Sequence, residues 1–429
     1  MPALLMFVHM WKAVSIDTWN KKRTQGISSV KETVEGIIEK VRNDGDRALI
    51  SLTEQFDHVT LDHIRVSEEE LDAAYEQVDT RLIEYLIEAE ARISRFHEMQ
   101  MPKELWLEEV EPGVVLGVKT TPLERIGAYI PGGRAAYPST ALMCAIPARV
   151  AGVSTICCCS PPPVQPLTLV AMDIAGVDEV YSIGGAQAVA AMALGTETIK
   201  PVEKIVGPGN VFVTMAKMLL RDSAEIDFPA GPSEIAILAD STGNPHFIAA
   251  DILAQAEHDP DAACILVTTD EDLPLKVWTS LQGQLRAEPR FEIIEKALEN
   301  SGFMTADSLS KGIDMINALA PEHLAIQVAD PLNALSGIRN AGSVFVGPYA
   351  AVACGDYSSG TNHVLPTAGY ARIYSGLDVH HFCKRSSVQA ISREGLDNIG
   401  DVVEGLADAE GLHAHAESVR IRRKKDAGL

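Results

Sequence analysis

From about Thr121 onward, short β-rich runs alternate with glycine-containing turns and alanine-rich stretches of helical length. Parallel strands need a crossover of about a dozen residues or more, usually a helix, to return to the same edge of a sheet. The alternation therefore predicts βαβ units, parallel sheets and the α/β fold class. The predicted strands cover residues 125–130, 155–160, 179–183, 204–206, 234–239, 263–267 and 343–346, and the predicted helices cover 136–150, 166–175, 186–194, 211–220, 245–257 and 275–300.

The first quarter of the chain is predicted to be mostly helical. Residues 29–55 are predicted to form an amphipathic helix, because Ser29 and Glu32 have the spacing of a capping box and apolar side chains follow at helical spacing. Residues 67–101 form a second amphipathic stretch that ends before Pro102. The mostly apolar residues 1–14 lack the basic start and the cleavage site of a signal peptide, so we expect either a docking strand or an overextended start.

Length and charge restrict the class of protein. A chain of 429 residues has room for about two to four domains of about 100–200 residues, and the element order fits two α/β domains, one inserted in the other. The net charge of −23 repels nucleic acid and anionic membranes, so small molecules or proteins are the expected partners. The seven cysteines form no CxxC pair, and no run reaches the roughly 18 apolar residues of a membrane span. We therefore expect a cytoplasmic protein.

Three glycine-containing turns follow predicted strands, namely Pro131-Gly132-Gly133, Gly184-Gly185-Ala186-Gln187 and Gly207-Pro208-Gly209-Asn210. Each turn could let backbone amides approach an anion at the start of a helix. None has the GxGxxG spacing, and each alone is more typical of plain loop geometry. Their repetition at successive strand ends favours a ligand site, because the ligands of open α/β sheets gather at that edge.

Candidate metal ligands lie in the C-terminal half of the chain, where seven of the 12 histidines follow residue 250. Gln255 and His258 are three residues apart on a predicted helix and can face one point, and Asp356 lies in a loop rich in donors and acceptors. Glu410 and His415 lie near the C-terminus. Imidazole and oxygen ligands suit a divalent metal, catalytic zinc included. With no HExxH or CxxC run, a satisfied surface or core histidine remains the alternative for each.

Glu322 and His323 are adjacent titratable residues after Pro321, where we expect a helix to begin. His323 could act as a general base, and the Glu322 carboxylate could position a water molecule. The alternative is a carboxylate that is favoured by the dipole at a helix N-terminus. From the dipeptide alone, both interpretations stay open.

Taken together, six motifs resemble the histidinol dehydrogenase family, and the resemblance runs from about Val30 to Arg423. The motifs are RIGAYIPGGR at 125–134, IVGPGN at 205–210, AGPSE at 230–234, AQAEH at 254–258, APEHL at 320–324 and GDYSSGTNHVLP at 355–366. The resemblance implies an NAD-dependent, zinc-containing homodimer. Such an enzyme oxidises L-histidinol through L-histidinal to L-histidine, the last step of histidine biosynthesis.

The resemblance also implies roles for individual residues. The implied zinc ligands are Gln255, His258, Asp356 and His415, of which His415 reaches the site of the other subunit. The implied acid/base pair is Glu322 and His323. The implied substrate contacts are Ser233, His363 and Glu410, together with His323 and the four zinc ligands. The implied NAD contacts are Tyr129, Gln187 and Asn210, which lie in or beside the glycine turns.

The implied fold consists of two incomplete Rossmann-like domains, one inserted in the other. A split α/β domain covers residues 24–125 and 235–372, and the inserted NAD-binding domain covers 126–234. Residues 1–23 and 373–429 form small terminal segments that are exchanged in the dimer, and the second of them contributes to the active site.

Departures from the family pattern lie near the substrate and leave alternatives open. Residues 349–353 carry no carboxylate, and His380-His381 replaces a less basic pair. A related zinc and NAD enzyme that acts on another alcohol, such as a sulfonated diol, is therefore an alternative, although Glu410 fits a cationic amine better. A non-catalytic nucleotide-binding protein of the same fold is a second alternative. A zinc hydrolase that uses Glu322 is a third, and it leaves the glycine turns and Asn210 without a role.

Overall fold

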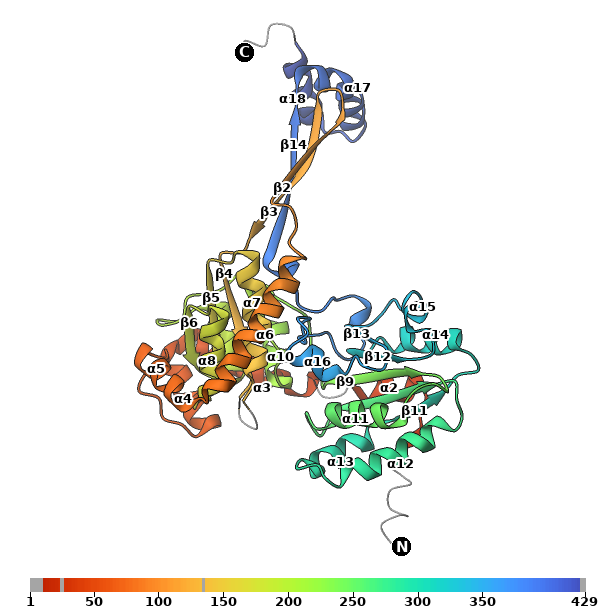
Figure 1. Cartoon of the computed structure of the whole chain (residues 1–429). Helices are drawn as coiled ribbons and strands as arrows, with labels where there is room; N and C mark the ends of the chain where they lie inside the picture. The colour runs from red at the N-terminus through yellow and green to blue at the C-terminus, as the bar shows by residue number, and fades with distance from the viewer. Residues whose placement is uncertain (1–10, 24–26, 133–135, 425–429) are drawn as a thin grey trace. The chain divides into compact units, whose positions relative to one another are not determined.

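The computed structural model describes residues 11–23, 27–132 and 136–424. Contacts divide the chain into two units, which are described separately (Figure 1). The larger unit comprises the described residues up to Gln100 together with Glu124–Phe382, and the smaller unit comprises Met101–Leu123 together with the described residues from Cys383 onward. The larger unit contains two parallel sheets, as the βαβ pattern of the sequence predicts.

One half of the larger unit is built on a five-stranded sheet with the order β6-β5-β4-β7-β8. Its strands are β4 (Arg125–Tyr129), β5 (Thr155–Ser160), β6 (Glu179–Ser182), β7 (Lys204–Val206) and β8 (Glu225–Ile226). Its helices are η2 (Ile27–Val30), α3 (Lys31–Asp44), α4 (Asp46–Asp57), α5 (Glu68–Gln77), α6 (Thr80–Glu98), α7 (Pro138–Ala151), α8 (Pro166–Ala175), α9 (Gly185–Leu194) and α10 (Val211–Leu219). Helix α3 packs against α9 and α10, whereas α8 packs against α5, α6 and α7.

The other half is built on a six-stranded parallel sheet with the order β1-β11-β10-β9-β12-β13. Its strands are β1 (Lys12–Ala13), β9 (Glu234–Ala239), β10 (Ala263–Thr268), β11 (Gly302–Thr305), β12 (His323–Gln327) and β13 (Ser343–Val346). Its helices are α2 (Ile16–Arg23), α11 (Pro245–Ala256), α12 (Leu273–Leu285), α13 (Phe291–Glu299), α14 (Leu309–Leu319), α15 (Pro331–Leu335) and α16 (Val352–Tyr357). The turns η3 (Tyr370–Arg372) and η4 (Val379–Phe382) end the unit. Strand β1 is the docking strand expected near the N-terminus, although residues 1–10 lie outside the described part.

Both faces of the six-stranded sheet are covered by helices (Figure 1). Along β9, Ile235 and Ile237 lie in a core with α11, α12 and α13, whereas Ala236 and Leu238 lie in a second core with α2, α14 and α15. Successive side chains of a strand point to opposite faces, so a strand covered on both sides is continuously apolar. This explains why β9 appears in the sequence as an uninterrupted apolar run.

The candidate site residues lie at the carboxyl edge of the five-stranded sheet and at the amino edge of the six-stranded sheet. The glycine turns follow the carboxyl ends of β4, β6 and β7. His323 instead is the first residue of β12, where it pairs with Ile235 of β9 and Ser343 of β13, so it lies at the amino edge of the six-stranded sheet. Helix α11 returns from the carboxyl end of β9 and places its own C-terminal end towards the amino edge.

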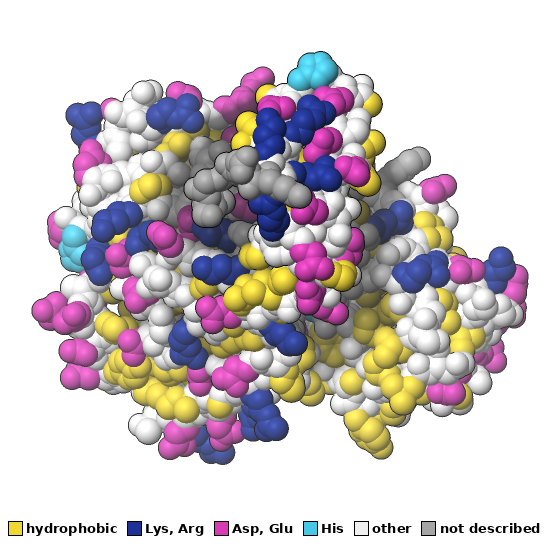
Figure 2. Space-filling model, turned by 90° about the horizontal axis from the view of Figure 1, so that it is seen from above, with side chains coloured by type: hydrophobic (Ala, Val, Ile, Leu, Met, Phe, Trp, Pro, Cys, Tyr) yellow, Lys and Arg dark blue, Asp and Glu magenta, His cyan; other side chains and the backbone are white. Residues whose placement is uncertain are grey.

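The smaller unit is an antiparallel sheet with two helices, and the sequence analysis did not predict it. Strand β3 (Val114–Pro122) pairs with β2 (Leu105–Glu111) on one side and with β14 (Cys383–Ile391) on the other. Helices α17 (Arg393–Ala409) and α18 (His413–Arg423) pack against each other. Among the described residues, no helix is both long and apolar enough to span a membrane. Acidic and basic side chains are interspersed on the face drawn in Figure 2.

Two predictions about the N-terminal helices were wrong in detail. The stretch 29–55 is not one helix, because Gly45 separates α3 from α4 with φ 54° and ψ −133°, a conformation that is essentially restricted to glycine. Its predicted capping box is also wrong, since α3 begins after Val30, whose apolar side chain cannot cap. A capping box does form at Ser67 and Glu70, where α5 begins.

The predicted helix start at Glu322-His323 was also wrong. Helix α14 ends at Leu319, its C-cap Ala320 adopts a left-handed conformation with φ 49°, and the chain then enters β12. The dipole interpretation of Glu322 therefore has no helix to rest on. The predicted domain boundaries stay a prediction; the apolar side chains of α3 and α4 share their core with the five-stranded sheet.

We predict opposite effects for alanine at two glycines of the N-terminal helices. Gly45→Ala should lower stability by about 1–3 kcal/mol, because the backbone there is strained for a residue with a Cβ atom. Gly36→Ala is the matched control: Gly36 is exposed in α3 and a Cβ atom there meets open space among the described residues, so it should stabilise by about 1 kcal/mol. Melting temperatures at one scan rate measure both effects, and equal shifts would contradict the assigned break.

A second prediction concerns Asp251 on α11, which accepts a hydrogen bond from the backbone N–H of Val352 and thereby joins α11 to the start of α16. Burial raises the pKa of Asp251 from its ordinary 3.8 to about 6. The ionised group therefore costs stability above about pH 6, and the cost disappears as the pH falls towards 4. Asp251→Asn should stabilise the metal-free protein by about 2–3 kcal/mol at pH 8 and by less at pH 5. Exposed Asp72→Asn is the control, and a pH-independent effect of Asp251→Asn would contradict this account.

Candidate active site

The adjacent residues Glu322 and His323 are buried at the start of β12, each 5% exposed. Glu322 Oε2 accepts a hydrogen bond from the backbone N–H of Glu234 at 2.7 Å and lies 3.5 Å from His323 Nδ1. His323 Nδ1 lies 3.3 Å from the Glu234 carbonyl oxygen, to which it donates when protonated. On the other side of the ring, His323 Nε2 lies 3.7 Å from Asp356 Oδ1. The imidazole thus lies between two carboxylates, with Nδ1 facing Glu322 and the Glu234 carbonyl oxygen and Nε2 facing Asp356.

Neighbouring charges and burial shift the pKa values of His323, Asp356 and His363. Burial alone would lower the pKa of His323, but the negative charges of Glu322 and Asp356 raise it to about 10. Burial would raise the pKa of Asp356, but the hydrogen bond and charge of His323, with smaller contributions from His363 and His258, hold it below its ordinary value. Burial is the main reason why the pKa of His363 is lowered. Asp356, His258, His323 and His363 are therefore close enough to influence one another.

Three of the four expected zinc ligands fit a divalent cation. Gln255 is 2% exposed, and its amide nitrogen has no hydrogen-bond partner among the described residues. The amide nitrogen and oxygen are interchangeable by a flip, so the oxygen can take that position and offer its lone pairs to a cation. Asp356 supplies an ionised carboxylate from α16, which packs against α11. His258 follows two residues after the end of α11, rather than on the predicted helix.

The fourth expected ligand, His415, lies on α18 of the smaller unit, as Glu410 does at the end of α17. Within the described residues, no three His, Cys, Asp or Glu side chains converge closely enough to hold a metal by themselves. The set formed by Gln255, His258 and Asp356 includes a glutamine and only two such residues, so it is compatible with that result.

The expected substrate contacts of the larger unit flank this cluster. Ser233 directly precedes β9, and its carbonyl oxygen accepts a hydrogen bond from Ala263 at 3.1 Å. His363 Nδ1 lies 2.9 Å from the Asp356 carbonyl oxygen, and its Nε2 lies 3.4 Å from the Thr140 hydroxyl on α7. Thr140 links the cluster to the half of the unit that carries the glycine turns.

The expected NAD contacts lie at the carboxyl edge of the five-stranded sheet. Tyr129 ends β4, and its hydroxyl oxygen accepts a hydrogen bond from the Gly185 N–H at 3.2 Å. Burial raises the pKa of Tyr129 to about 12. Gln187 lies in the first turn of α9, which begins after Gly184, a residue without a side chain that could cap the helix. Asn210 Oδ1 caps α10 by accepting from the N–H groups of Phe212 and Val213, at 3.0 and 3.1 Å.

The starts of α9 and α10 differ in how their backbone N–H groups are bonded. Asn210 Oδ1 already accepts from two N–H groups of α10. The N-cap of α9, Gly184, has no side chain, and the Gly185 N–H donates to the Tyr129 hydroxyl oxygen. A Cβ atom at Gly132 or at Gly184 would meet Pro161, at 3.1 and 2.6 Å, so these two turns approach the same proline. Residues 133–135 of the first turn lie outside the described part. The structure thus favours α9 over α10 as the helix start open to an anion.

Several residues that shape the cluster give little signal in the sequence. Glu234 belongs to the AGPSE motif, but its backbone N–H and carbonyl oxygen contact Glu322 and His323 only through strand pairing. Asp251 and Thr140 are common residue types inside apolar helices and do not stand out. The one available signal was the helical spacing of Asp251 and Gln255, which places both on one face of α11.

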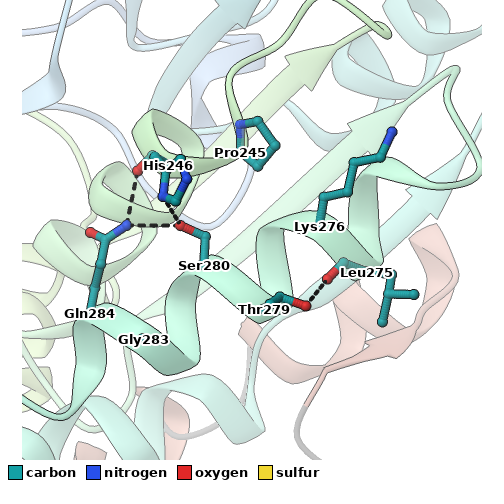
Figure 3. A pocket seen from close by; sticks show the side chains of 8 residues that line it. All are labelled: Pro245, His246, Leu275, Lys276, Thr279, Ser280, Gly283 and Gln284. Carbon is teal, nitrogen blue, oxygen red and sulfur yellow. Dashed lines mark hydrogen bonds between the residues drawn. The ribbon is translucent and has the colours of Figure 1, made fainter.

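A surface hollow of about 580 Å³ between the start of α11 and α12 contains none of these residues (Figure 3). Its lining residues are Pro245, His246, Leu275, Lys276, Thr279, Ser280, Gly283 and Gln284. His246 Nδ1 lies 2.7 Å from the Ser280 hydroxyl, which also accepts from Gln284 Nε2 at 3.0 Å. These contacts join the two helices at the carboxyl side of the sheet, away from β12's first residue.

Comparison with known proteins identifies the family of the chain. The model of the histidinol dehydrogenase family matches residues 20–423. Histidinol dehydrogenase of Methanosarcina mazei is 53% identical over 404 residues, which are 93% of each chain, and that of Methanothermobacter thermautotrophicus is 53% identical over 406 residues, 93% of this chain and 95% of the relative. A crystal structure of histidinol dehydrogenase from Elizabethkingia anophelis has a TM-score of 0.93 at 40% identity and covers 96% of this chain and 98% of its own. The chain is therefore an oxidoreductase that belongs to the histidinol dehydrogenase family.

Proposed function

We propose that this chain is a cytoplasmic, NAD-dependent and zinc-assisted enzyme that oxidises L-histidinol through L-histidinal to L-histidine, the last step of histidine biosynthesis. The observation that carries the proposal is the group of buried Glu322 and His323 with Asp356 of α16, which packs against α11, where the buried Gln255 amide nitrogen lacks a partner among the described residues. Seven free cysteines, five of them buried, agree with a reducing compartment.

Gln255, His258 and Asp356 would hold the zinc ion, and His415 from the other subunit of a homodimer would complete the set. When bound, zinc supplies Lewis-acid polarisation of the substrate oxygen and has no redox role of its own. Ser233 and His363 would contact the substrate, and Glu410 would offer a negative charge to its ammonium group. Tyr129, Gln187 and Asn210 would contact NAD. Gln187 lies in the first turn of α9, and Asn210 ends the third glycine turn and caps α10 through its Oδ1.

His323 would accept the substrate hydroxyl proton while hydride leaves for NAD. Its Nδ1 is directed to the Glu234 carbonyl oxygen, so the proton-accepting nitrogen of the neutral ring is Nε2. The negative charges of Glu322 and Asp356 raise the pKa of His323, and a cation held by Asp356 would lower it again and favour the neutral ring that can accept a proton. In the second half-reaction, Glu322 would take a proton from water as it adds to the aldehyde, and the resulting hydrate would give its hydride to a second NAD.

The smaller unit supports the proposed homodimer. Its strand β2 and helix α17 expose large apolar side chains: Leu105 is 51%, Trp106 44%, Leu107 50% and Leu406 62% exposed. Large apolar side chains left exposed in one unit are consistent with a surface that a partner chain covers. We propose that residues 1–23 and 373–429 are the segments exchanged in the dimer, around a split domain of 24–125 with 235–372 and an inserted NAD-binding domain of 126–234.

The stoichiometry of NADH formation tests the proposed function. With limiting L-histidinol, the zinc-loaded enzyme should form two NADH per substrate, because two hydrides leave the same carbon. Removing zinc with a chelator should abolish turnover, and adding zinc back should restore it. One NADH per substrate would reject the four-electron reaction, and turnover of a sulfonated diol in place of L-histidinol would favour a different substrate.

Substitutions of the catalytic pair should separate the two half-reactions. His323→Asn and Glu322→Gln should each keep zinc and reduce turnover by about 10²–10⁴-fold, the usual contribution of general acid–base catalysis. Glu322→Gln should affect the oxidation of L-histidinal most, since it removes the group assigned to water. His246→Asn, which alters a hydrogen-bonded histidine outside the cluster, is the matched control and should retain activity. Equal and mild losses in both variants and both steps would contradict the assignment.

A further inference from the structure

Lys217 and Asp227 form a buried ion pair that the proposed reaction does not use. Lys217 lies on α10 and Asp227 directly follows β8; they are 3% and 5% exposed, and Lys217 Nζ contacts Asp227 Oδ1. Both positions lie within the half of the larger unit that is built on the five-stranded sheet. Neither residue contacts Glu322, His323 or the expected zinc ligands in the hydrogen bonds and ion pairs of the described residues.

The pair makes hydrogen bonds to both backbone groups of a single residue, Gly207. The Gly207 N–H donates to Asp227 Oδ2 at 2.8 Å, and Lys217 Nζ donates to the Gly207 carbonyl oxygen at 3.0 Å. Asp227 Oδ1 also accepts from the Phe228 N–H at 2.7 Å. The carboxylate and the ammonium group are therefore satisfied by each other and by the backbone of the turn that begins at Gly207.

Gly207 needs this support because its position is unusual. Its φ of 104° favours glycine, and a Cβ atom there would lie 2.2 Å from the Tyr129 carbonyl oxygen. The turn is thus pressed against the end of β4, and three residues later it reaches Asn210, which caps α10. A shift of Gly207 would move Tyr129 and Asn210 relative to each other.

Stability gives little reason for such a pair. Burying two charges costs desolvation free energy, and apolar side chains of similar volume are often equally stable or more so in its place. The pair instead fixes the position of Gly207, because the Asp227 carboxylate accepts from its N–H and the Lys217 ammonium group donates to its carbonyl oxygen. A buried charged network that is fully satisfied makes the backbone it holds rigid.

We propose that Lys217 and Asp227 are positioning residues for the dinucleotide, which fix the turn 207–210 so that Tyr129 and Asn210 are preorganised to bind NAD. The proposal deepens the proposed function and rests on NAD binding at the carboxyl edge of the five-stranded sheet. It requires that loss of the pair weakens NAD binding while the zinc and L-histidinol half of the site is retained.

The test compares the zinc-loaded wild type with the double variant Lys217→Met/Asp227→Asn, which removes both charges and leaves no unpaired buried ion. The NAD dissociation constant from calorimetry should rise by about tenfold or more, and KM for NAD should rise with it. KM for L-histidinol and zinc content should change by less than about twofold. Hydrogen exchange at the amides of Gly207 and of residues 209–213 should become faster.

Lys204→Met is the matched control. Lys204 is also on this sheet, at the start of β7, and its Nζ donates to the His381 carbonyl oxygen at 2.6 Å. It should leave NAD affinity unchanged. If the double variant fails to fold, Asp227→Glu keeps both charges and displaces the carboxylate by one methylene, and it should still weaken NAD binding.

Unchanged NAD affinity in a folded, zinc-loaded double variant, or in Asp227→Glu, would overturn the proposal. An equal loss in Lys204→Met would do the same, because the effect would then belong to the sheet as a whole. A wild type that binds no NAD would overturn the proposed function instead, so the two failures are distinguishable.

Discussion

The structure of the site depends on one buried electrostatic arrangement, the imidazole of His323 between the carboxylates of Glu322 and Asp356. An unpaired charge at the edge of an apolar sheet would cost several kcal/mol, so each group must be satisfied by a specific neighbour. Glu322 accepts a hydrogen bond from the Glu234 N–H and lies within ion-pair distance of His323. Asp356 lies within ion-pair distance of His323, whose buried Nε2 makes no hydrogen bond among the described residues. These contacts require β9 and β12 to be adjacent and in register, and α16 to end beside them. The strand order of the six-stranded sheet meets this requirement.

The same arrangement has one excess negative charge when the ring is protonated and two when it is neutral. In the proposed function, a cation held by Asp356, Gln255 and His258 would offset that charge and would leave His323 able to accept a proton. In the proposed function, the two sheets would bind different parts of the reaction's components. The five-stranded sheet offers glycine turns at its carboxyl edge, the usual ligand edge of open α/β sheets. The six-stranded sheet offers Glu322 and His323, at the start of β12 on its amino edge, for the acid–base chemistry of the proposed function.

The sequence predicted the parallel sheets well, because strands that are covered on both faces are continuous apolar runs between helices of regular length. It predicted the site less completely. The strand β12 was missed because Pro321 before two charged residues is typical of a helix start, and only the left-handed Ala320 shows that the preceding helix ends there. The hairpin of β2 and β3 was missed although Pro112-Gly113 separates two β-rich runs, since half-exposed strands have weak apolar patterns. Contacts made by the backbone, such as those of Glu234, depend on tertiary pairing and have no signature in the residue type.

X-ray absorption at the zinc edge of the dialysed, zinc-loaded enzyme tests the central claim most directly. If Gln255, His258, Asp356 and His415 hold the metal, the first shell contains only nitrogen and oxygen, with two imidazole ligands, and Asp356→Ala loses the bound zinc while Cys354→Ala keeps it. A sulfur ligand, or zinc retained at full occupancy without Asp356, would contradict the account.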